Sequence, residues 1–341
     1  MKKKEKDEHF AAQIQGVLPY HQQMLADGVR NKLLYEAIKK NVTSETTFLD
    51  IGAGTGIWAI LAAKLGAKRV VAVEMEESLI PIIFRLAQEN GVADKIEIIH
   101  AHSNDMKIRG KFNLIVSELF GAAVFGEATI NAFVKLRNRF LVPNGILIPQ
   151  KLAMFAVPVR VENSIQNLPA ELPIKCDFFK FLKFNYSQSY SLSDRQRIKF
   201  LAEPQKFIEV DFRTVESNPS LQNLSLSWKL ENLSEANAFA TFTHSFFTEE
   251  IKMDAFDSRS WNTTIYEFQP FVQTVGEINF NLSLEHNTEN WSVGLPSNRE
   301  VKMQNYSPVF AFARVRMTQQ MTPHRRFKPP KRSNRKKATK P

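Results

Sequence analysis

Two glutamates, Glu118 and Glu127, lie nine residues apart and follow directly on the apolar run 114–116. A short apolar run of this kind is typical of a buried parallel strand, so both acids are expected on the loop at its carboxyl end. Open α/β sheets bind their ligands at that edge. Two carboxylates there would form an anionic clamp for a planar cation such as guanidinium, which presents five N–H donors in a fixed fork. The alternative is a helix cap or a solvated loop charge, with Glu127 at the start of the next helix.

A glycine turn upstream indicates what would meet such a cation. The turn contains three glycines, Gly52, Gly54 and Gly56. Ile57 stands where a dinucleotide fingerprint has its third glycine, and the Gly-Lys-Ser/Thr ending of a P-loop is missing. Asp50, on the strand just before the turn, suits a ligand with an ammonium group, whose carboxylate can approach the glycine backbone. The alternative for Asp50 is that it only caps the following helix.

Polar residues follow the next two predicted strands. Glu74 ends the apolar run 70–73, about 20 residues beyond the glycine turn, where an acid can hold ribose hydroxyls. The run 96–99 leads into a polar stretch that contains Ser103 and Asn104 and suits an adenine edge. An amino-acid end, a ribose and an adenine together describe S-adenosylmethionine. The alternative for Glu74 is a solvated strand end.

The elements that must position these residues fall into two groups. From 46 to about 150, apolar strands alternate with helical stretches, which predicts βαβ units and a parallel sheet. After 150, glycine is scarce and short alternating strands recur, which predicts an antiparallel barrel or sandwich. Helices are expected over 21–40, 78–90 and 127–140, and strands of the second part over 153–161, 207–212, 224–230, 238–246, 263–268, 277–284 and 310–317. The predicted organisation is a flexible segment 1–19, a cofactor domain 20–150, a β domain 151–321 and a disordered basic tail 322–341.

The charge of the chain is concentrated at its end. The formal net charge is +10, and the tail from His324 onward holds nine basic residues and no acid, so the remainder is almost neutral. Such an arm could bind nucleic acid or an acidic protein, act as a nuclear signal, or only improve solubility. A single cysteine, Cys176, excludes an internal disulfide. The charged start and the lack of about 18 consecutive apolar residues argue against a secretory signal and a membrane span, so we expect a cytoplasmic or nuclear protein.

At this point the chain resembles the protein arginine N-methyltransferases. The matching segments are the glycine motif 49–57, the loop that carries Glu118 and Glu127, and the segment 21–30, which looks like the part of the family that folds over the cofactor. The segment 141–149 resembles the exit from the cofactor domain. The resemblance implies a Rossmann-like, S-adenosylmethionine-dependent methyltransferase domain followed by an antiparallel β-barrel.

The resemblance also implies roles and partners. Met24 would pack near the sulfonium, Arg30 would pair with the methionyl carboxylate, and Trp261 would pack beside the substrate arginine. Protein or peptide arginines are the implied substrates, and a homodimer is implied, with a dimerisation arm near 173–196. Residues 102–105, 118–120 and 125–127 look more like the type III and type II branches, which make monomethylarginine or symmetric dimethylarginine. We therefore expect arginine methylation, with monomethylation as the product.

Three departures from the family pattern define the alternatives. Ala11, Ala12 and Gln15 stand about where the aromatic residues of the N-terminal helix are expected, Ser260 replaces the histidine of a Thr-His-Trp loop, and Asn104 replaces a glutamate near the adenine. The first two make a catalytically impaired, cofactor-binding scaffold the main alternative. A nucleic-acid methyltransferase ranks last, because the segment 117–120 lacks the Asn/Asp-Pro-Pro-aromatic motif.

Overall fold

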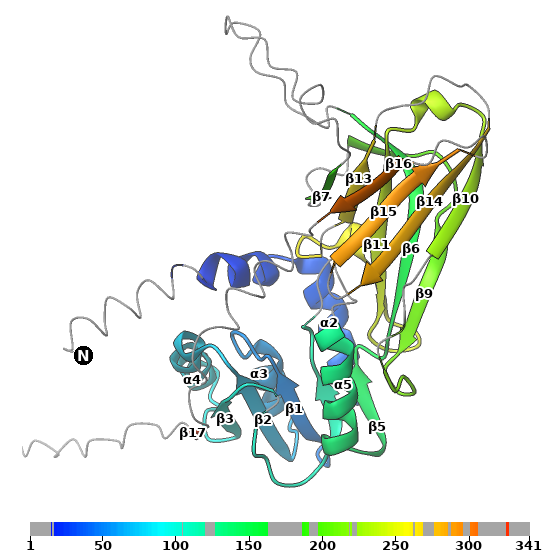
Figure 1. Cartoon of the computed structure of the whole chain (residues 1–341). Helices are drawn as coiled ribbons and strands as arrows, with labels where there is room; N and C mark the ends of the chain where they lie inside the picture. The colour runs from blue at the N-terminus through cyan, green and yellow to red at the C-terminus, as the bar shows by residue number, and fades with distance from the viewer. Residues whose placement is uncertain are drawn as a thin grey trace, which may run out of the picture.

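The structure is a computed structural model. It describes residues 15, 17–103, 105–119, 127–162, 186–190, 197–217, 219, 224–261, 263–268, 276–285, 288–295, 301–305 and 325–326. Two domains are visible, a mixed helix–sheet domain and a β domain, with the helical residues 17–25 and helix α2 (Gly28–Asn41) at their junction (Figure 1). In the described part of the chain, no helix is both long and apolar enough to cross a bilayer.

The first domain is built on a sheet of parallel strands. Its order is β17-β3-β2-β1-β4-β5, and all pairs from β3 to β5 are parallel. The parallel strands are β1 (Thr47–Ile51), β2 (Arg69–Glu74), β3 (Ile96–His100), β4 (Phe112–Val116) and β5 (Leu141–Ile148). The apolar residues of the inner strands β1, β2 and β4 are buried, as expected for a sheet covered on both faces. This confirms the Rossmann-like domain.

Helices follow these strands in the alternation that the sequence predicts. They are α3 (Ile57–Lys64), the 3₁₀ turn η1 (Glu77–Leu79), α4 (Ile80–Glu89) and α5 (Glu127–Phe140). Helix α3 packs on β1 and β2, α4 on β3, and α5 on β5. The helix expected over 21–40 is interrupted at Ala26–Asp27. The break has a local cause, because the Asp27 carboxylate accepts a hydrogen bond from the Arg30 backbone N–H and so starts a new helix.

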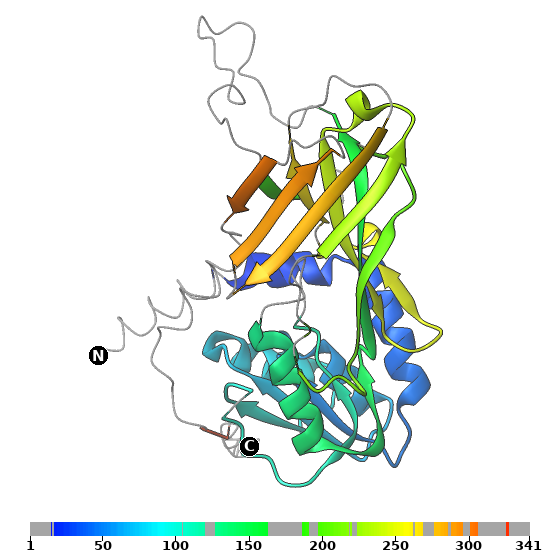
Figure 2. The same cartoon turned by 45° about the vertical axis from the view of Figure 1, so that its right-hand side comes forward.

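The β domain consists of two antiparallel sheets. One has the order β7-β13-β11-β6-β8, with β12 on β11 and β9 on β6, and the other has the order β10-β14-β15-β16. The first contains β6 (Lys151–Val161), β7 (Tyr186–Tyr190), β8 (Ile198–Phe200), β9 (Gln205–Asp211), β11 (Ala238–Phe246), β12 (Lys252–Asp254) and β13 (Thr263–Glu267). The second contains β10 (Leu224–Leu230), β14 (Gly276–Glu285), β15 (Thr288–Gly294) and β16 (Val301–Asn305). Figure 2 shows the second sheet facing the viewer.

Aromatic side chains fill the space between the two sheets. Phe239 of β11 stacks on Phe280 of β14 with ring centroids 4.7 Å apart, and Trp228, Tyr266 and Trp291 belong to the same buried cluster. A second core crosses the junction between the domains. There, Phe133 of α5 packs on Phe212 with centroids 4.5 Å apart. The expected antiparallel β domain is confirmed, and the packed junction gives its loops a fixed position over the first domain.

Several sequence expectations fall partly or wholly outside the described residues. The strand expected over 310–317 lies outside them. Of the segment 173–196, residues 186–190 form β7, which pairs with β13 at the edge of its sheet, and the rest is outside the described part. Of the basic tail, Arg325–Arg326 form β17, which pairs antiparallel with β3.

Candidate active site

The glycine turn joins β1 to α3 at the carboxyl edge of the sheet. Gly52, Gly54 and Gly56 all have positive φ values, of 69°, 57° and 80°. The backbone N–H groups of Gly52 and Ala53 donate to the Val73 carbonyl at 2.9 and 3.0 Å, which ties the turn to β2. The φ of Gly54 makes any other residue strained there, and an added Cβ would also lie 2.8 Å from the end of the His21 side chain, which would have to move. The turn therefore has the conformation expected for a ligand-binding loop.

Asp50 is buried beneath this turn. Its Oδ2 accepts a hydrogen bond from the Ala59 backbone N–H at 3.1 Å. Asp50 therefore also caps the first turn of α3, which was the alternative role expected for it. Desolvation by burial raises the pKa of Asp50 to about 7, with a contribution from the nearby Glu74 charge. A cationic group placed beside Asp50 would reverse this shift, which suits the ammonium end of a ligand.

Glu74 is held against the same turn and is not a solvated strand end. Its Oε2 accepts from the Gly54 backbone N–H at 2.7 Å, and its Oε1 accepts from the backbone N–H groups of Met75 and Glu76, both at 2.8 Å. The side chain is buried. Burial raises its pKa despite these hydrogen bonds. The carboxylate therefore links the ends of β1 and β2, where a ribose is expected.

The polar turn after β3 lies next to Glu74. The Ala101 backbone N–H donates to the Glu74 carbonyl at 3.0 Å, and the turn continues with a hydrogen bond from the Asp105 N–H to the His102 carbonyl at 2.9 Å. Ser103 is half-buried in this turn, and Asn104 lies outside the described residues. The sequence thus placed Ser103 at the edge where the adenine contact is expected.

Glu118 lies two residues beyond the end of β4, and both of its carboxylate oxygens have partners. Its side chain is 6% exposed, its Oε2 forms an ion pair with the Arg30 guanidinium, and its Oε1 accepts from the Trp261 indole N–H at 2.9 Å. Desolvation raises the pKa of Glu118, while Arg30 and Trp261 counteract this effect. The structure therefore brings together Glu118, Arg30 and Trp261, which are far apart in the sequence.

Two of these residues have contacts that the sequence did not predict. Arg30 was expected at a ligand carboxylate, yet its Nη2 binds Glu118 and its Nη1 donates to Asn31 Oδ1 at 2.9 Å. Its Nε is buried and has no hydrogen-bond partner among the described residues. Trp261, expected beside a substrate arginine, directs its indole N–H at Glu118. Glu127 begins α5 as predicted, and its side chain is outside the described part of the structure.

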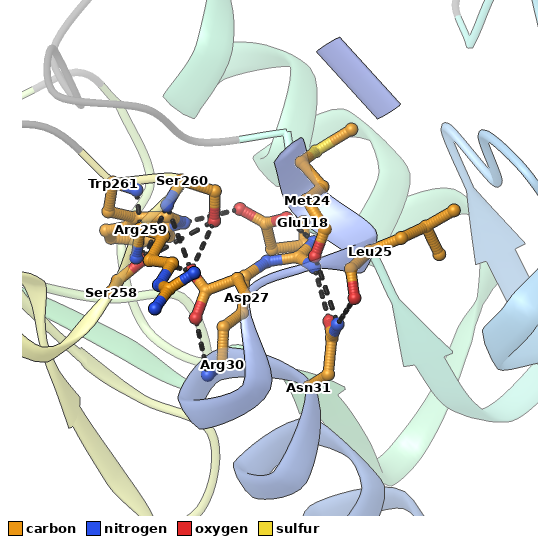
Figure 3. A network of polar contacts seen from close by, with 10 residues as sticks. All are labelled: Met24, Leu25, Asp27, Arg30, Asn31, Glu118, Ser258, Arg259, Ser260 and Trp261. Atoms are coloured by element: carbon orange, nitrogen blue, oxygen red, sulfur yellow. Dashed lines mark hydrogen bonds and ion pairs between the residues drawn. The ribbon is translucent and has the colours of Figure 1, made fainter. Parts of the chain in front are cut away.

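Figure 3 shows further residues around this centre, among which Asp27, Asn31 and Ser258 were not singled out from the sequence. Asp27 is buried and accepts hydrogen bonds from the loop 258–260 of the β domain. Asn31 Nδ2 donates to the carbonyls of Met24 and Leu25 at 3.0 and 2.9 Å and fixes the turn that precedes α2. Met24 is half-buried at this turn. The only available signal was the aspartate three residues before Arg30, which is a helix-capping pattern.

The donor set of the site fits S-adenosylmethionine. The unpartnered Nε of Arg30 is a buried donor that requires an acceptor, and a carboxylate would supply it. Asp50 and Glu74 offer buried carboxylates on the two sides of a glycine turn. Together, the parallel sheet, the glycine turn and the appended β domain define a Rossmann-like, S-adenosylmethionine-dependent methyltransferase architecture.

Comparisons with known proteins agree with this class. The family model for ribosomal protein L11 methyltransferase (PrmA) matches residues 31–151. A zebrafish protein arginine N-methyltransferase 6 is 28% identical over 250 residues, which are 67% of this chain and 69% of that protein. The rice (japonica) protein arginine N-methyltransferase PRMT10 is 34% identical over 155 residues, which are 44% of this chain and 40% of that protein. The chain thus spans less than half of the rice relative, and its similarity is to protein arginine N-methyltransferases, the family that the resemblance named.

Solved structures extend the likeness of fold to the β domain. A Trypanosoma brucei PRMT1 enzyme–prozyme heterotetrameric complex with AdoHcy has a TM-score of 0.67 at 20% identity, and the match covers 84% of this chain and 96% of that one. Arabidopsis thaliana protein arginine methyltransferase 10 has a TM-score of 0.64 at 18% identity, with the same coverage. At these identities the likeness concerns the fold.

Proposed function

We propose that the protein transfers a methyl group from S-adenosylmethionine to a guanidinium nitrogen of arginine in protein substrates. The observation that carries the proposal is the buried Glu118 carboxylate, which already holds a guanidinium, that of Arg30, at the end of β4. A carboxylate offers about four acceptor positions, and Arg30 and Trp261 use two of them. The remaining positions suit a second, substrate guanidinium.

The cofactor, when bound, supplies a methyl group that is already activated on a sulfonium. The residues that would hold it are Arg30 at the carboxylate, Asp50 at the ammonium and Glu74 at the ribose hydroxyls. Ser103 and Asn104 would hold the adenine, and Met24 would pack near the sulfur. The glycine backbone at the turn allows the close approach that this placement needs.

The acids act by binding and orientation. Arginine remains protonated in the ground state, because its pKa exceeds about 12, so Glu118 and Glu127 bind it as a cation through charge-assisted hydrogen bonds. This fixes one nitrogen in line for reaction and excludes water. When the methyl–sulfur bond breaks, leaving a neutral thioether, and the C–N bond forms, Glu127 or water would take the proton that the nitrogen loses. Trp261 orients Glu118 and packs beside the arginine stem.

The product and the assembly are further parts of the proposal. Monomethylarginine is the product we favour, because residues 102–105, 118–120 and 125–127 look like the type III and type II branches, of which type III makes monomethylarginine. We also propose a cytoplasmic or nuclear homodimer whose basic tail binds nucleic acid or an acidic protein. Light scattering of the purified chain, with and without residues 327–341, would test the assembly and the contribution of the tail.

Incubation of the purified chain with isotope-labelled S-adenosylmethionine and arginine-rich peptides tests the proposed activity. Transfer of one methyl group per arginine, read by mass spectrometry with fragmentation, is the expected result. Cofactor binding without transfer to any peptide would favour the impaired scaffold. Transfer to nucleic acid alone would contradict both readings.

A further inference from the structure

A single carboxylate oxygen connects the first helical segment to the β domain. Asp27 Oδ2 accepts from Ser258 Oγ at 2.5 Å, from the backbone N–H groups of Arg259 and Ser260 at 2.9 and 3.0 Å, and from Ser260 Oγ at 2.7 Å (Figure 3). Its other oxygen, Oδ1, caps α2 through the Arg30 N–H at 3.1 Å. Burial works to raise the pKa of Asp27, but these hydrogen bonds outweigh it and hold the pKa below its ordinary value. Asp27 is therefore an ionised anchor for the loop.

Within the β domain, the same contacts fix the backbone position of Trp261. The Ser258 hydroxyl donates to Asp27 and accepts from the Trp261 backbone N–H at 2.9 Å and from the Ser260 N–H at 3.2 Å. Ser258 and Trp261 are 1% and 3% exposed, so water does not substitute for these bonds. The hydroxyl thus closes the loop into a turn and aims the indole at Glu118.

The contacts form a closed ring around Glu118. Starting from Asp27, one path runs through Ser258 and Trp261 to Glu118 Oε1, and the other runs through α2 and Arg30 to Glu118 Oε2. Both carboxylate oxygens are therefore held, which fixes the plane of the carboxylate. Gln23 adds a second link to the loop, with its Nε2 donating to the Arg259 carbonyl at 2.9 Å.

We propose that Ser258 and Ser260 are positioning residues, which with Asp27 set the orientation of Trp261 and so of the Glu118 carboxylate toward the substrate guanidinium. Two hydroxyls and two backbone N–H groups thereby supply the donors at a loop where the family resemblance implies a histidine. The inference rests on the proposed function and concerns its substrate side, because none of these groups lies in the glycine turn. If the serines supply these donors, the missing loop histidine is no longer a reason to expect a catalytically impaired scaffold.

The test compares Ser258→Ala and Ser260→Ala with the conservative Ser260→Thr and the control Ser225→Ala, an exposed serine of β10. We expect each of the first two to lower kcat/KM for an arginine-rich peptide about tenfold, as loss of a hydrogen bond to a charged group would. The cofactor Kd should stay within about twofold. Ser260→Thr restores the hydroxyl and should recover most of the activity, and Ser225→Ala should match the parent.

Two further measurements separate positioning from folding. In a double-mutant cycle, the Asp27→Asn, Ser260→Ala double variant should lose less kcat/KM than the product of the two single fold-losses. The reason is that both substitutions remove the same contact. Ser258→Ala should shift the tryptophan emission, and the shift should vanish in a Trp261→Phe background. Unchanged peptide kinetics with unchanged emission would overturn the inference. So would equal losses of cofactor binding, thermal stability and activity, which indicate a structural role alone.

The failure of this inference is distinguishable from failure of the proposed function. A parent chain that binds the cofactor but transfers no methyl group contradicts the proposed function. In that protein, the emission shift of Ser258→Ala and its loss with Trp261→Phe still decide whether the hydroxyl positions the indole. An active parent whose variants keep its kinetics and emission contradicts the inference alone.

Discussion

Glu118→Gln removes the charge at the centre of the site and keeps the size of the side chain. The amide oxygen can still accept from Trp261, so the shape of the pocket is retained, while the ion pair with Arg30 is lost. Breaking a buried pair by removing one partner costs about 3–5 kcal/mol, and the lower end applies here because the amide still accepts a hydrogen bond. For a chain of 341 residues, with an unfolding entropy of about 2.1 cal/mol/K per residue, a loss of about 3 kcal/mol lowers the unfolding temperature by roughly 4 °C.

The effect on activity follows from the two acceptor positions that Glu118 has left for a substrate. A hydrogen bond to a charged group is worth about 1.5–3 kcal/mol, so the loss of two, about 3–6 kcal/mol, amounts to a fall of about 10²–10⁴ in kcat/KM. The cofactor affinity should not fall, because the glycine turn, Asp50 and Glu74 are untouched, and it should rise by at most about fivefold because Arg30 loses its competing partner. Bound cofactor should also recover part of the lost thermal stability, since its carboxylate would pair with Arg30.

The assay combines methyl transfer to a peptide, calorimetric cofactor binding and thermal unfolding. Glu45→Gln is the matched control, because Glu45 forms an ion pair with Lys68 on the surface, with side chains 76% and 60% exposed. Pairs of this kind contribute little, so the control should be within about 1 kcal/mol of the parent and fully active. Unchanged turnover in Glu118→Gln would refute the clamp, whatever the change in stability.

Three further predictions follow from other parts of the structure. Gly54→Val should abolish cofactor binding, because the position has a φ of 57° and its Cβ would meet His21; normal binding by calorimetry would contradict the placement of the turn. Because the pKa of Asp50 is raised to about 7, cofactor affinity should rise about tenfold between pH 6 and 8 as Asp50 ionises. If the affinity of Asp50→Asn does not depend on pH, Asp50 is the group that causes the rise. By linkage, the same raised pKa lowers folding stability as the pH rises from about 4 to 7. Arg137→Ala should lower the free energy of unfolding by about 1–3 kcal/mol, because Nη1 of Arg137 donates to two carbonyls of the segment 212–215 at 2.8 Å; equal denaturation midpoints would argue against that contact.

The parts of the site that the sequence predicted are those fixed by local spacing. Asp50 and the glycines follow one strand directly, and Glu74 ends the next, so the parallel sheet alone brings them to one edge. Glu118 was predicted for the same reason, from the end of β4. In the β domain, six strands (β6, β9, β10, β11, β13 and β14) were predicted from their alternation. Strands β8 and β12 have three residues each and give too short a pattern to recognise. Strands β7, β15 and β16 were also missed.

The remaining features depend on contacts between distant parts of the chain. Asp27 and Ser258 are separated by 231 positions, and nothing near either residue indicates the other. The partner of Arg30 could not be predicted either, because a guanidinium can satisfy any nearby carboxylate and the choice of Glu118 depends on how α2 packs over the sheet. The break in the helix after Leu25 was readable in principle, since aspartate is a preferred N-cap residue, but the helical period continues across it.

The charges of the site explain why it should prefer cations. Four acids, Asp27, Asp50, Glu74 and Glu118, are buried around the glycine turn and the adjoining loop, and Arg30 is the one base among them in the described residues. Burial of this excess negative charge raises the pKa of Asp50, Glu74 and Glu118. Under the proposed function, the donor brings a sulfonium and an ammonium and the substrate brings a guanidinium, so each ligand relieves part of the repulsion. Under the same proposal, methyl transfer would remove the sulfonium charge, and these acids would then attract the spent cofactor less strongly than the donor.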